Sequence, residues 1–579
     1  MGDEVTRVAV DTGCLPDEPA PQSCQSNSVV AKSESEIIEV ADETDKTNKT
    51  FEYLILRHIG EFGIYQIRLF VVLTLMDLPT SICMSLFIFS AAHPGWHCGR
   101  FVGSNDTYNG TWPNSTSEMC EMNGAPCEEY VFKEDFTSIV TDWNLVCDYA
   151  YIPKMTVSIQ MVGVLIGAIL GGQAADTIGR KKTLLVAATV EFTMQSLLML
   201  SNSWQLYTAM SFIKGVFISG SICVCSTLPM EFIGTRYRTL VGTVGIWGFG
   251  SMLMALVAWQ LVSWRYLALS TGLMGIPLIF GIILFVPESI RWLIQKGRFD
   301  EAEKIIREMA RVNKREVPDM SVLKQIAKEA EKRQKEEGQY SYHDLFRTAD
   351  MAKRAAVIML TWFTASLFAY GISNMYDTFS GTINVNLCIS SAVSMVFAWS
   401  IIPSADRFGR RKTFFGYIMV PIACLTGVVI IGAIGVKWIV PDLVTALVLI
   451  GKGGIVSVWY IASIVASELF PTLMRNIAMG MCSVAARIGG ILAPQVALLG
   501  QISHWTVPYI IIGLLSILCA VLFLVVLPET NKVPLQEEMP PRRRKKHQHV
   551  EENGIELTEP LNQEEDHQTN GQPYLVGKP

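Results

Sequence analysis

Charged side chains are scarce in this sequence, because Asp, Glu, Lys and Arg together make up only 17% of its 579 residues. Soluble proteins are about 25% charged, whereas half of this chain is hydrophobic and its mean hydropathy is +0.33. A large soluble helical core would need polar helix faces, which most of the apolar runs lack. Runs of this length predict transmembrane helices. We expect about twelve spans, near 68–92, 155–172, 183–201, 205–227, 240–263, 265–286, 355–376, 384–402, 413–433, 440–464, 475–499 and 506–527.

Signatures of several other functions are missing as well. The sequence has no Gly-x-x-x-x-Gly-Lys-Ser/Thr stretch and no soluble nucleotide domain, which argues against an ATP-driven pump. Its 8 His residues lie outside the apolar runs or at their edges. We therefore expect no metal site, no cofactor, no enzymatic activity and no nucleic-acid partner. A channel would need ringed carbonyl or charge filters, which are also lacking.

Basic residues are absent from the connections between spans three and four, seven and eight, and eleven and twelve. They gather instead after spans two, four and eight, at Arg180, Lys181, Lys182, Arg236, Arg238, Arg407, Arg410, Arg411 and Lys412. Positive charge stays on the cytosolic side of a membrane, which predicts a multi-pass protein of the plasma membrane with both termini in the cytosol. The first 50 residues are polar and acidic, without the apolar core of a cleavable signal peptide.

The connection 93–152 is long and is predicted to be extracellular. It contains four cysteines, Cys98, Cys120, Cys127 and Cys147, and three acceptor sequons, at Asn105, Asn109 and Asn114. Four cysteines in an oxidising compartment predict two disulfides, with three possible pairings.

The two halves of the chain resemble each other. "AADTIGRKK" is matched by "SADRFGRRK", "PMEFIGTRYR" by "ASELFPTLMR", and "VPESIRW" by "LPETNKV", at similar separations. A duplicated six-span unit with a site between its halves is the design of alternating-access transporters. We therefore divide the chain into a disordered tail 1–52, a first half 53–286, a cytosolic linker 287–353 with amphipathic helices, a second half 354–530 and a disordered tail 531–579.

The segment "GGQAADTIGRKK" places an Asp, a Gly and several cations at the end of a span. Cations near the end of a helix compensate its partial negative charge, but an Asp at a membrane edge is costly unless it is paired. Asp176 can hold Arg180 across a tight turn or accept donors from a neighbouring span. The repeat predicts two cytosolic latches, from Asp176, Gly179, Arg180, Asp406, Gly409 and Arg410, with Glu231, Glu468 and Arg475 as salt-bridge partners.

These segments resemble the major facilitator superfamily and, within it, the organic cation/anion/carnitine transporter family (solute carrier family 22). "TDWNLVCD", "GEFGIYQIRLF", "PESIRWLIQKGRFDEAEKII", "LTWFTASLFAYGIS" and "SVAARIGGILAP" follow in the order of that family. The resemblance implies an all-α major facilitator fold of about twelve helices in two six-helix repeats, with a large extracellular loop between helices 1 and 2. The sequence departs from the family pattern at two points. Ile402 stands in place of the first Gly of the second loop motif, and Ser211 stands in place of an Arg of span four.

Arg487 is the most informative charge inside a span, because a basic residue at this position is typical of the anion and carnitine members of the family. An Arg fork suits a carboxylate. The resemblance therefore implies polyspecific transport of organic anions or zwitterions such as carnitine. An organic cation transporter, a sugar-porter-like carrier, a non-transporting sensor and a purely structural Arg487 stay open, as do uniport, exchange and Na⁺ coupling.

Further charges inside the spans are functional candidates. Lys452 is expected to face the cavity or to snorkel, Lys214 and Glu191 to pair across adjacent helices, and Asp77 to line a cavity beside a helix broken at Pro79. Aromatic walls suit varied organic ions. Candidates for such walls are Trp247, Trp362, Tyr370, Trp459 and Tyr460.

Overall fold

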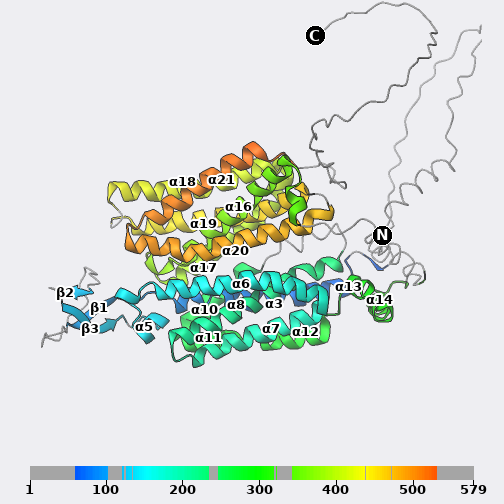
Figure 1. The fold of residues 1–579 in the computed structure, drawn as a ribbon, viewed down its shortest axis with the longest axis horizontal. Coiled ribbons are helices and arrows are strands. Elements are labelled where there is room, and N and C mark those ends of the chain that lie inside the picture. The colour runs from blue at the N-terminus through cyan, green and yellow to red at the C-terminus, as the bar shows by residue number, and fades with distance from the viewer. Residues whose placement is uncertain are drawn as a thin grey trace, which may run out of the picture.

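The computed structural model describes residues 59–60, 62–101, 120–122, 125–133, 135–233, 246–317, 321, 342–436, 439–470 and 472–530. The predicted tails 1–52 and 531–579 and the sequons at Asn105, Asn109 and Asn114 lie outside these ranges. Long helices run side by side in two bundles, with a small sheet at one end and two short helices at the other (Figure 1). We call the end with the sheet the sheet end, and the opposite end, where the two loop motifs lie, the motif end.

Each bundle is built from one half of the sequence (Figure 1). The first half contains α3 (Ile64–Ser85), α4 (Phe87–Ser90), α6 (Ile152–Ile178), α7 (Arg180–Leu197), α8 (Trp204–Thr227), α10 (Trp247–Gln260), α11 (Trp264–Leu273) and α12 (Ile276–Phe285). The second half contains α16 (Ala349–Ser373), the 3₁₀ turn η5 (Tyr376–Thr378), α17 (Ile383–Phe408), α18 (Arg410–Ile434), α19 (Pro441–Leu469), α20 (Thr472–Ile502) and α21 (Val507–Val526). The halves meet where α6 contacts α20 and where α10 contacts α17.

Among the described residues, 11 helices are long and apolar enough to cross a membrane. They correspond to eleven of the expected spans, and α10 lies at the place of the remaining one, near 240–263. The prediction of a multi-pass helical membrane protein is therefore confirmed.

Small residues bring neighbouring helices of each half into backbone contact. A Cβ atom on Gly167 of α6 would lie 2.0 Å from the Val216 carbonyl oxygen of α8. In the second half, a Cβ on Gly489 of α20 would lie 2.4 Å from the Phe363 carbonyl oxygen of α16. Such close approach is a common way for membrane helices to gain packing contacts.

The prediction that α3 is broken at Pro79 was wrong, since α3 continues through Pro79 to Ser85. A Pro removes one backbone donor, but neighbouring helices and hydroxyl side chains let membrane helices tolerate it. The Ser81 hydroxyl donates to the Leu78 carbonyl oxygen (2.9 Å) just beside this point.

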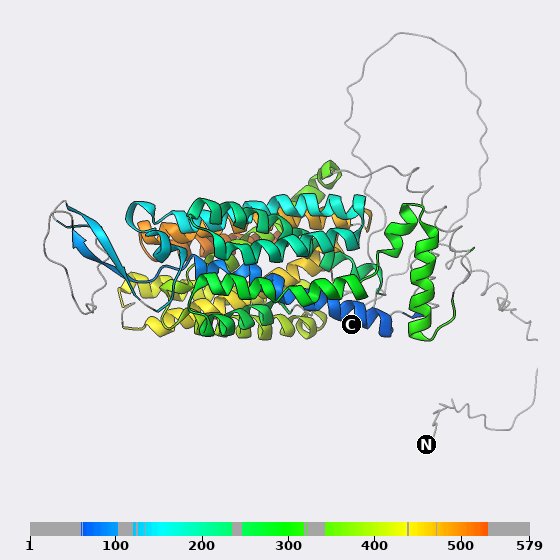
Figure 2. The same cartoon turned by 90° about the horizontal axis from the view of Figure 1, so that it is seen from below.

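A three-stranded antiparallel sheet lies in the long connection between α4 and α6, with strand order β1 (Trp96–Phe101), β3 (Ala125–Phe132), β2 (Glu121–Met122). Figure 2 shows it extending beyond the helices at the sheet end. The disulfides join Cys98 to Cys127 and Cys120 to Cys147, which selects one of the three possible pairings. The first bond joins β1 to β3. The second joins Cys120, just before β2, to the 3₁₀ turn η1 (Cys147–Tyr149) that precedes α6.

The "TDWNLVCD" segment braces the first half at the sheet end. Asp142 of α5 (Ile139–Trp143) accepts from Trp264 Nε1 and from Arg265 Nε, each at 3.0 Å. Arg265 also donates to the carbonyl oxygens of Met199 and Ser201, each at 2.7 Å. The segment therefore holds two connections in place next to the sheet, the one between α10 and α11 and the one between α7 and α8.

At the motif end, α13 (Ile290–Gln295) and α14 (Phe299–Asn313) form the described part of the linker. Asn313 closes α14 against α3: its Oδ1 accepts from the Tyr65 amide (2.9 Å) and its Nδ2 donates to Gln66 Oε1 (2.8 Å). The linker thus packs against the first half, as Figure 2 shows. Residues 318–320 and 322–341 of the predicted linker lie outside the described residues.

Candidate functional site

Arg180 is the centre of the first loop motif. It lies at the start of α7, and its Nη2 is 2.9 Å from Asp176 Oδ1, one turn earlier. Its Nε is 3.4 Å from Glu231 Oε1, at the far end of α8. The Arg180 guanidinium therefore connects the end of α6, the start of α7 and the segment after α8. Its two partners, Asp176 in the same loop and Glu231 from another helix, are those that the sequence suggested.

Arg410 repeats this arrangement in the second half. Its Nη1 is 3.3 Å from Asp406 Oδ1, and its Nη2 is 2.9 Å from Glu468 Oε1 at the end of α19. Each arginine also donates to the carbonyl oxygen of the residue before its Asp, at Ala175 (3.0 Å) and Ala405 (3.1 Å). The two motifs are thus equivalent in geometry as well as in sequence.

Glu288 and Glu529 complete the two motifs in a way that the sequence did not suggest. Glu288 precedes α13, which begins at Ile290 with Ser289 as N-cap. The Glu288 carboxylate accepts from the backbone amides of Arg180 (2.7 Å) and Lys181 (3.1 Å), at the N-terminus of α7. Glu529 accepts in the same way from the amides of Arg410 (2.7 Å) and Arg411 (3.1 Å) of α18.

Positive φ angles at Gly179 (115°) and Gly409 (85°) turn the chain so that these amides face the glutamates. A carboxylate at a helix N-terminus is favourable because the free amides and the helix dipole both stabilise it. Arg475 takes no part in either described motif: its Nε and Nη2 are buried and make no hydrogen bond within the described chain.

Polar contacts join the two halves near the sheet end. Lys154 Nζ donates to the Asn374 carbonyl oxygen (2.6 Å) and lies 3.8 Å from Asp377 Oδ2. Ser158 of α6 donates to the Ile491 carbonyl oxygen of α20 (2.8 Å) and accepts from Gln495 Nε2 (3.1 Å). The structure is therefore closed between the halves at this end.

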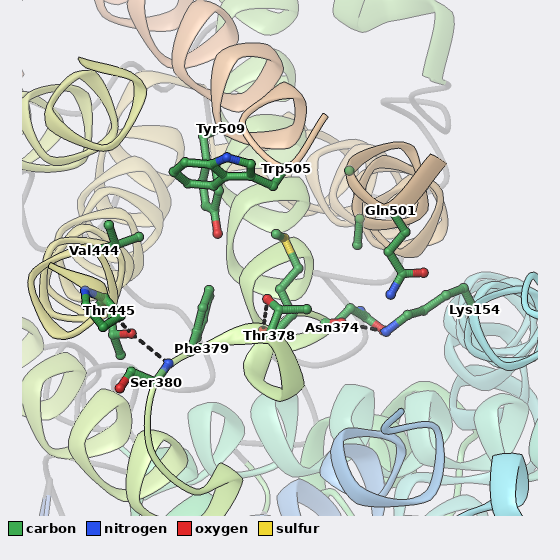
Figure 3. Close-up of a pocket in the computed structure, with 14 residues that line it drawn as sticks. Lys154, Asn374, Thr378, Phe379, Ser380, Val444, Thr445, Gln501, Trp505 and Tyr509 are labelled. Carbon is green, nitrogen blue, oxygen red and sulfur yellow. Dashed lines mark hydrogen bonds between the residues drawn. The ribbon is translucent and has the colours of Figure 1, made fainter. Parts of the chain in front are cut away.

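A cavity of about 150 Å³ lies in the same region. Figure 3 shows Lys154 on one side of it and Thr445 of α19 on the opposite side, with Trp505 and Tyr509 above and Phe379 between. None of the residues that the sequence suggested for substrate binding lines it. The cavity therefore belongs to the region where the halves are closed at the sheet end.

Arg487 lies near the middle of α20, on the helix that packs against both α6 and α16. A Cβ on Gly490, one turn further, would approach Tyr370 Cδ2 (3.5 Å) and Met161 Sδ (3.6 Å) of those two helices. Its charge acts on Cys223 of α8 in the first half. Arg487 Nε is buried without a hydrogen-bond partner, and no acid forms an ion pair with Arg487 among the described residues.

The aromatic candidates divide into two groups. Trp362 of α16 and Trp459 of α19 are in edge contact, with ring centroids 5.8 Å apart, and Trp362 Nε1 is buried without a partner. Tyr370 and Tyr460 are half-buried on the same two helices, whereas Trp247 lies at the first described turn of α10 and packs against the core. Four of the five therefore come from α16 and α19, next to the helix that carries Arg487.

Lys452 of α19 faces the outer part of the second half. Its Nζ donates to Ser373 Oγ (2.8 Å) and to Tyr376 OH (2.5 Å), and it lies 4.7 Å from the centroid of the Tyr376 ring. These contacts hold the end of α16 against α19, which favours a positioning role.

The first half contains a buried polar cluster that departs from expectation. Lys214 and Glu191 are both 0% exposed, but they form no ion pair within 4.0 Å. Lys214 donates instead to Gln195 Oε1 (3.1 Å) and to the Cys83 carbonyl oxygen (3.3 Å). Gln195 follows Glu191 by one turn of α7 and accepts the Lys214 hydrogen bond in place of Glu191. A polar Gln within this apolar run is the sequence signal that could have indicated the contact.

The family model described as "Sugar (and other) transporter" matches residues 114–540. The "Organic cation transporter protein" of Drosophila melanogaster is 32% identical over 83% of this chain and 93% of its own length. The chain belongs to solute carrier family 22 of the major facilitator superfamily. "Solute carrier family 22 member 15" of Xenopus tropicalis (31% identical, 86% and 92% covered) and human "Organic cation/carnitine transporter 2" (31%, 74% and 76%) are further members of this solute carrier family.

Solved structures support the same fold. The xylose transporter XylE of E. coli in its inward open conformation has a TM-score of 0.59 at 16% identity, covering 82% of this chain and 98% of that chain. The fold expected from the sequence is thus confirmed as a mostly helical major facilitator fold. The protein belongs to a family of transporters that carry small molecules across a membrane, and it is not an enzyme.

Proposed function

We propose that this solute carrier family 22 protein carries organic anions or zwitterions such as carnitine across the plasma membrane by alternating access. In this proposal the sheet end is extracellular and both termini are cytosolic. The observation that supports the substrate class is Arg487, a cation near the middle of α20 without an acidic partner in the described chain. An uncompensated cation at this depth is costly unless it meets an anion, and a substrate carboxylate supplies one in fork geometry.

The aromatic pair Trp362–Trp459 on the neighbouring helices supports the same site. Its rings offer a large apolar contact area and can face an ammonium group. A zwitterion of the carnitine type would therefore place its carboxylate on Arg487 and its quaternary ammonium against these rings.

The two loop motifs act, in this proposal, as latches at the cytosolic end. Each motif holds the helices of its own half together through one arginine, Arg180 or Arg410. Each also lies in a loop between two helices, and we expect this loop to move when the halves rock. Na⁺ coupling, exchange and uniport are all compatible with the site itself.

Organic cation transport is the second candidate, because two of the relatives named above carry "organic cation" in their names. The test is uptake of labelled carnitine, p-aminohippurate and tetraethylammonium into cells that express the protein, with surface abundance measured for each variant. Wild type is expected to prefer carnitine or p-aminohippurate. Arg487→Asp should lower that uptake roughly tenfold or more, because a charge-assisted hydrogen bond contributes about 1.5–3 kcal/mol.

Arg487→Lys is the matched control, since it keeps the charge but loses the fork, and it should retain more uptake than Arg487→Asp. A preference for tetraethylammonium that Arg487→Asp leaves unchanged would contradict the anion or zwitterion proposal. A protein that reaches the surface and takes up none of the three compounds would favour a non-transporting sensor.

A further inference from the structure

Glu191 is a fully buried acid. It lies on α7 at 0% exposure, and no described residue donates to either of its carboxyl oxygens in hydrogen-bond geometry. An ionised carboxylate in such a position would lack both water and fixed donors, which costs several kcal/mol or more. A protonated carboxyl group avoids most of that cost.

The nearest cation does not neutralise Glu191 in this conformation. Lys214 directs its ammonium group to Gln195 Oε1 (3.1 Å) and the Cys83 carbonyl oxygen (3.3 Å). Gln195 is itself held, because its Nε2 donates to Thr271 Oγ1 of α11 at 2.8 Å. The lysine is therefore engaged one turn away from the acid, yet close enough for its charge to act on Glu191.

The hydroxyl groups around Glu191 can serve either protonation state of the acid. The hydroxyls of Thr80 on α3 and Ser221 on α8 lie beside the carboxyl group, both buried and both without a hydrogen-bond partner. A hydroxyl can accept the proton of a carboxylic acid as well as donate to it. The remaining titratable groups that face Glu191 are Asp77 and the thiols of Cys83 and Cys225.

Asp77 connects this cluster with the centre of the molecule. It lies on α3, partly exposed, and its charge acts on Glu191, on Cys225 of α8 and on Tyr460 of α19 in the second half. Asp77 is therefore within electrostatic reach of both the buried acid and the second half. Its side chain is only partly buried, whereas that of Glu191 is fully buried.

We propose that Glu191 is a proton-binding site that couples substrate transport to a proton gradient, with Asp77 as the relay to the centre. The step is a transfer without change of oxidation state. A proton from water binds the Asp77 carboxylate, passes to the Glu191 carboxylate and leaves Asp77 ionised again. When Glu191 releases the proton toward the other side, Lys214 can turn from Gln195 to pair with the anion. The coupling rests on the transport function proposed above; the protonation of Glu191 does not.

The protonation is tested on the purified full-length protein by infrared difference spectroscopy, which needs no substrate. The carbonyl stretch of a protonated carboxylic acid should be present near neutral pH, shift in D₂O and disappear in Glu191→Gln. Glu303→Gln is the control, since it removes an acid that is ion-paired on the surface of α14, and it should leave the band unchanged. A wild-type spectrum without that band, or a band that survives in Glu191→Gln, would overturn the proposal.

The coupling is tested in proteoliposomes with labelled carnitine, p-aminohippurate and tetraethylammonium. For a compound that exchanges, an inward proton gradient of one pH unit should support up to about tenfold accumulation. Glu191→Gln should abolish that accumulation but still exchange the compound, because exchange requires no net proton movement. Asp77→Asn should slow the response to the gradient.

The outcomes separate the two proposals. If the compounds exchange but only a Na⁺ gradient, and no proton gradient, drives accumulation, the coupling proposal is wrong while the transport function stands. If no compound exchanges, the proposed transport function fails, and the infrared band alone decides whether Glu191 holds a proton.

Discussion

Lys154 of α6 and Asp377 of η5 form an ion pair of 3.8 Å across the two halves, with side chains only 6% and 5% exposed. The backbone amide of His93 donates to the same Asp377 carboxylate at 3.0 Å. One buried acid thus joins the end of the first helix, the start of α6 and the end of α16. The alternating access proposed above would separate these elements, so this contact belongs to a state closed at the sheet end.

Removing one partner of this pair should open the sheet end more often. Asp377→Asn leaves the Lys154 ammonium buried without its counter-charge, and such losses cost about 3–5 kcal/mol. Gln495 of α20 donates to Ser158, four residues after Lys154 on α6. We expect a cysteine placed at Gln495 to react faster with a membrane-impermeant thiol reagent added at the sheet end. The readout is the labelling rate in Asp377→Asn relative to wild type, each with the Gln495→Cys background.

The charge swap Lys154→Asp with Asp377→Lys is the control for this experiment. It restores one cation and one anion and should bring the labelling rate back toward wild type. Equal labelling of all three proteins would show that the ion pair does not hold the halves together.

The caps of α7 and α18 should be needed for stability of the two halves. Glu288→Gln removes the charge that faces two backbone amides at the N-terminus of α7. Capping contributions of this kind are about 0.5–2 kcal/mol, and we expect a lower unfolding temperature of the purified protein. Glu529→Gln should have a similar effect through α18.

Glu316→Gln offers a surface control for this pair, because Glu316 lies exposed after α14. Its unfolding temperature should match that of wild type. A stable Glu288→Gln protein with reduced transport would assign the cap to conformational switching instead.

The repeated motifs show what the sequence could predict. Asp176 with Arg180 and Asp406 with Arg410 are one helical turn apart, so their pairing follows from local geometry. Periodic apolar runs likewise predicted the helices, because hydrophobicity and length decide insertion in a membrane. Local patterns of this kind were sufficient for the fold.

Contacts that depend on side-chain competition were beyond the sequence. Lys214 could reach Glu191 or Gln195, and only their relative placement on α7 decides for Gln195. The four cysteines of the long connection allowed three pairings. The Cys98–Cys127 bond depends on the antiparallel association of β1 with β3, which the sequence does not show. The sheet itself was not predicted, since its strands are short and are interrupted by cysteine and glycine.

The two disulfides should stabilise the outer sheet independently. Peptide mapping without reduction is expected to recover Cys98 linked to Cys127 and Cys120 linked to Cys147. Closing loops of this size stabilises a folded unit by about 3 kcal/mol in the chain-entropy view. The double variant Cys98→Ser/Cys127→Ser should therefore increase protease cleavage in the connection between α4 and α6, whereas Cys388→Ser, at a free thiol of α17, should not.

The close contact of α6 with α8 should depend on Gly167 and not on its neighbour Gly172. A Cβ on Gly167 would lie 2.0 Å from the Val216 carbonyl oxygen, so Gly167→Ala must push the two helices apart. Overpacking of this kind typically costs about 1–3 kcal/mol, and the unfolding temperature of the purified protein should fall. A Cβ on Gly172 meets no atom within 4 Å, so Gly172→Ala adds a better helix former without a clash. Its unfolding temperature should equal or exceed that of wild type, and a comparable loss in both variants would contradict the α6–α8 packing described here.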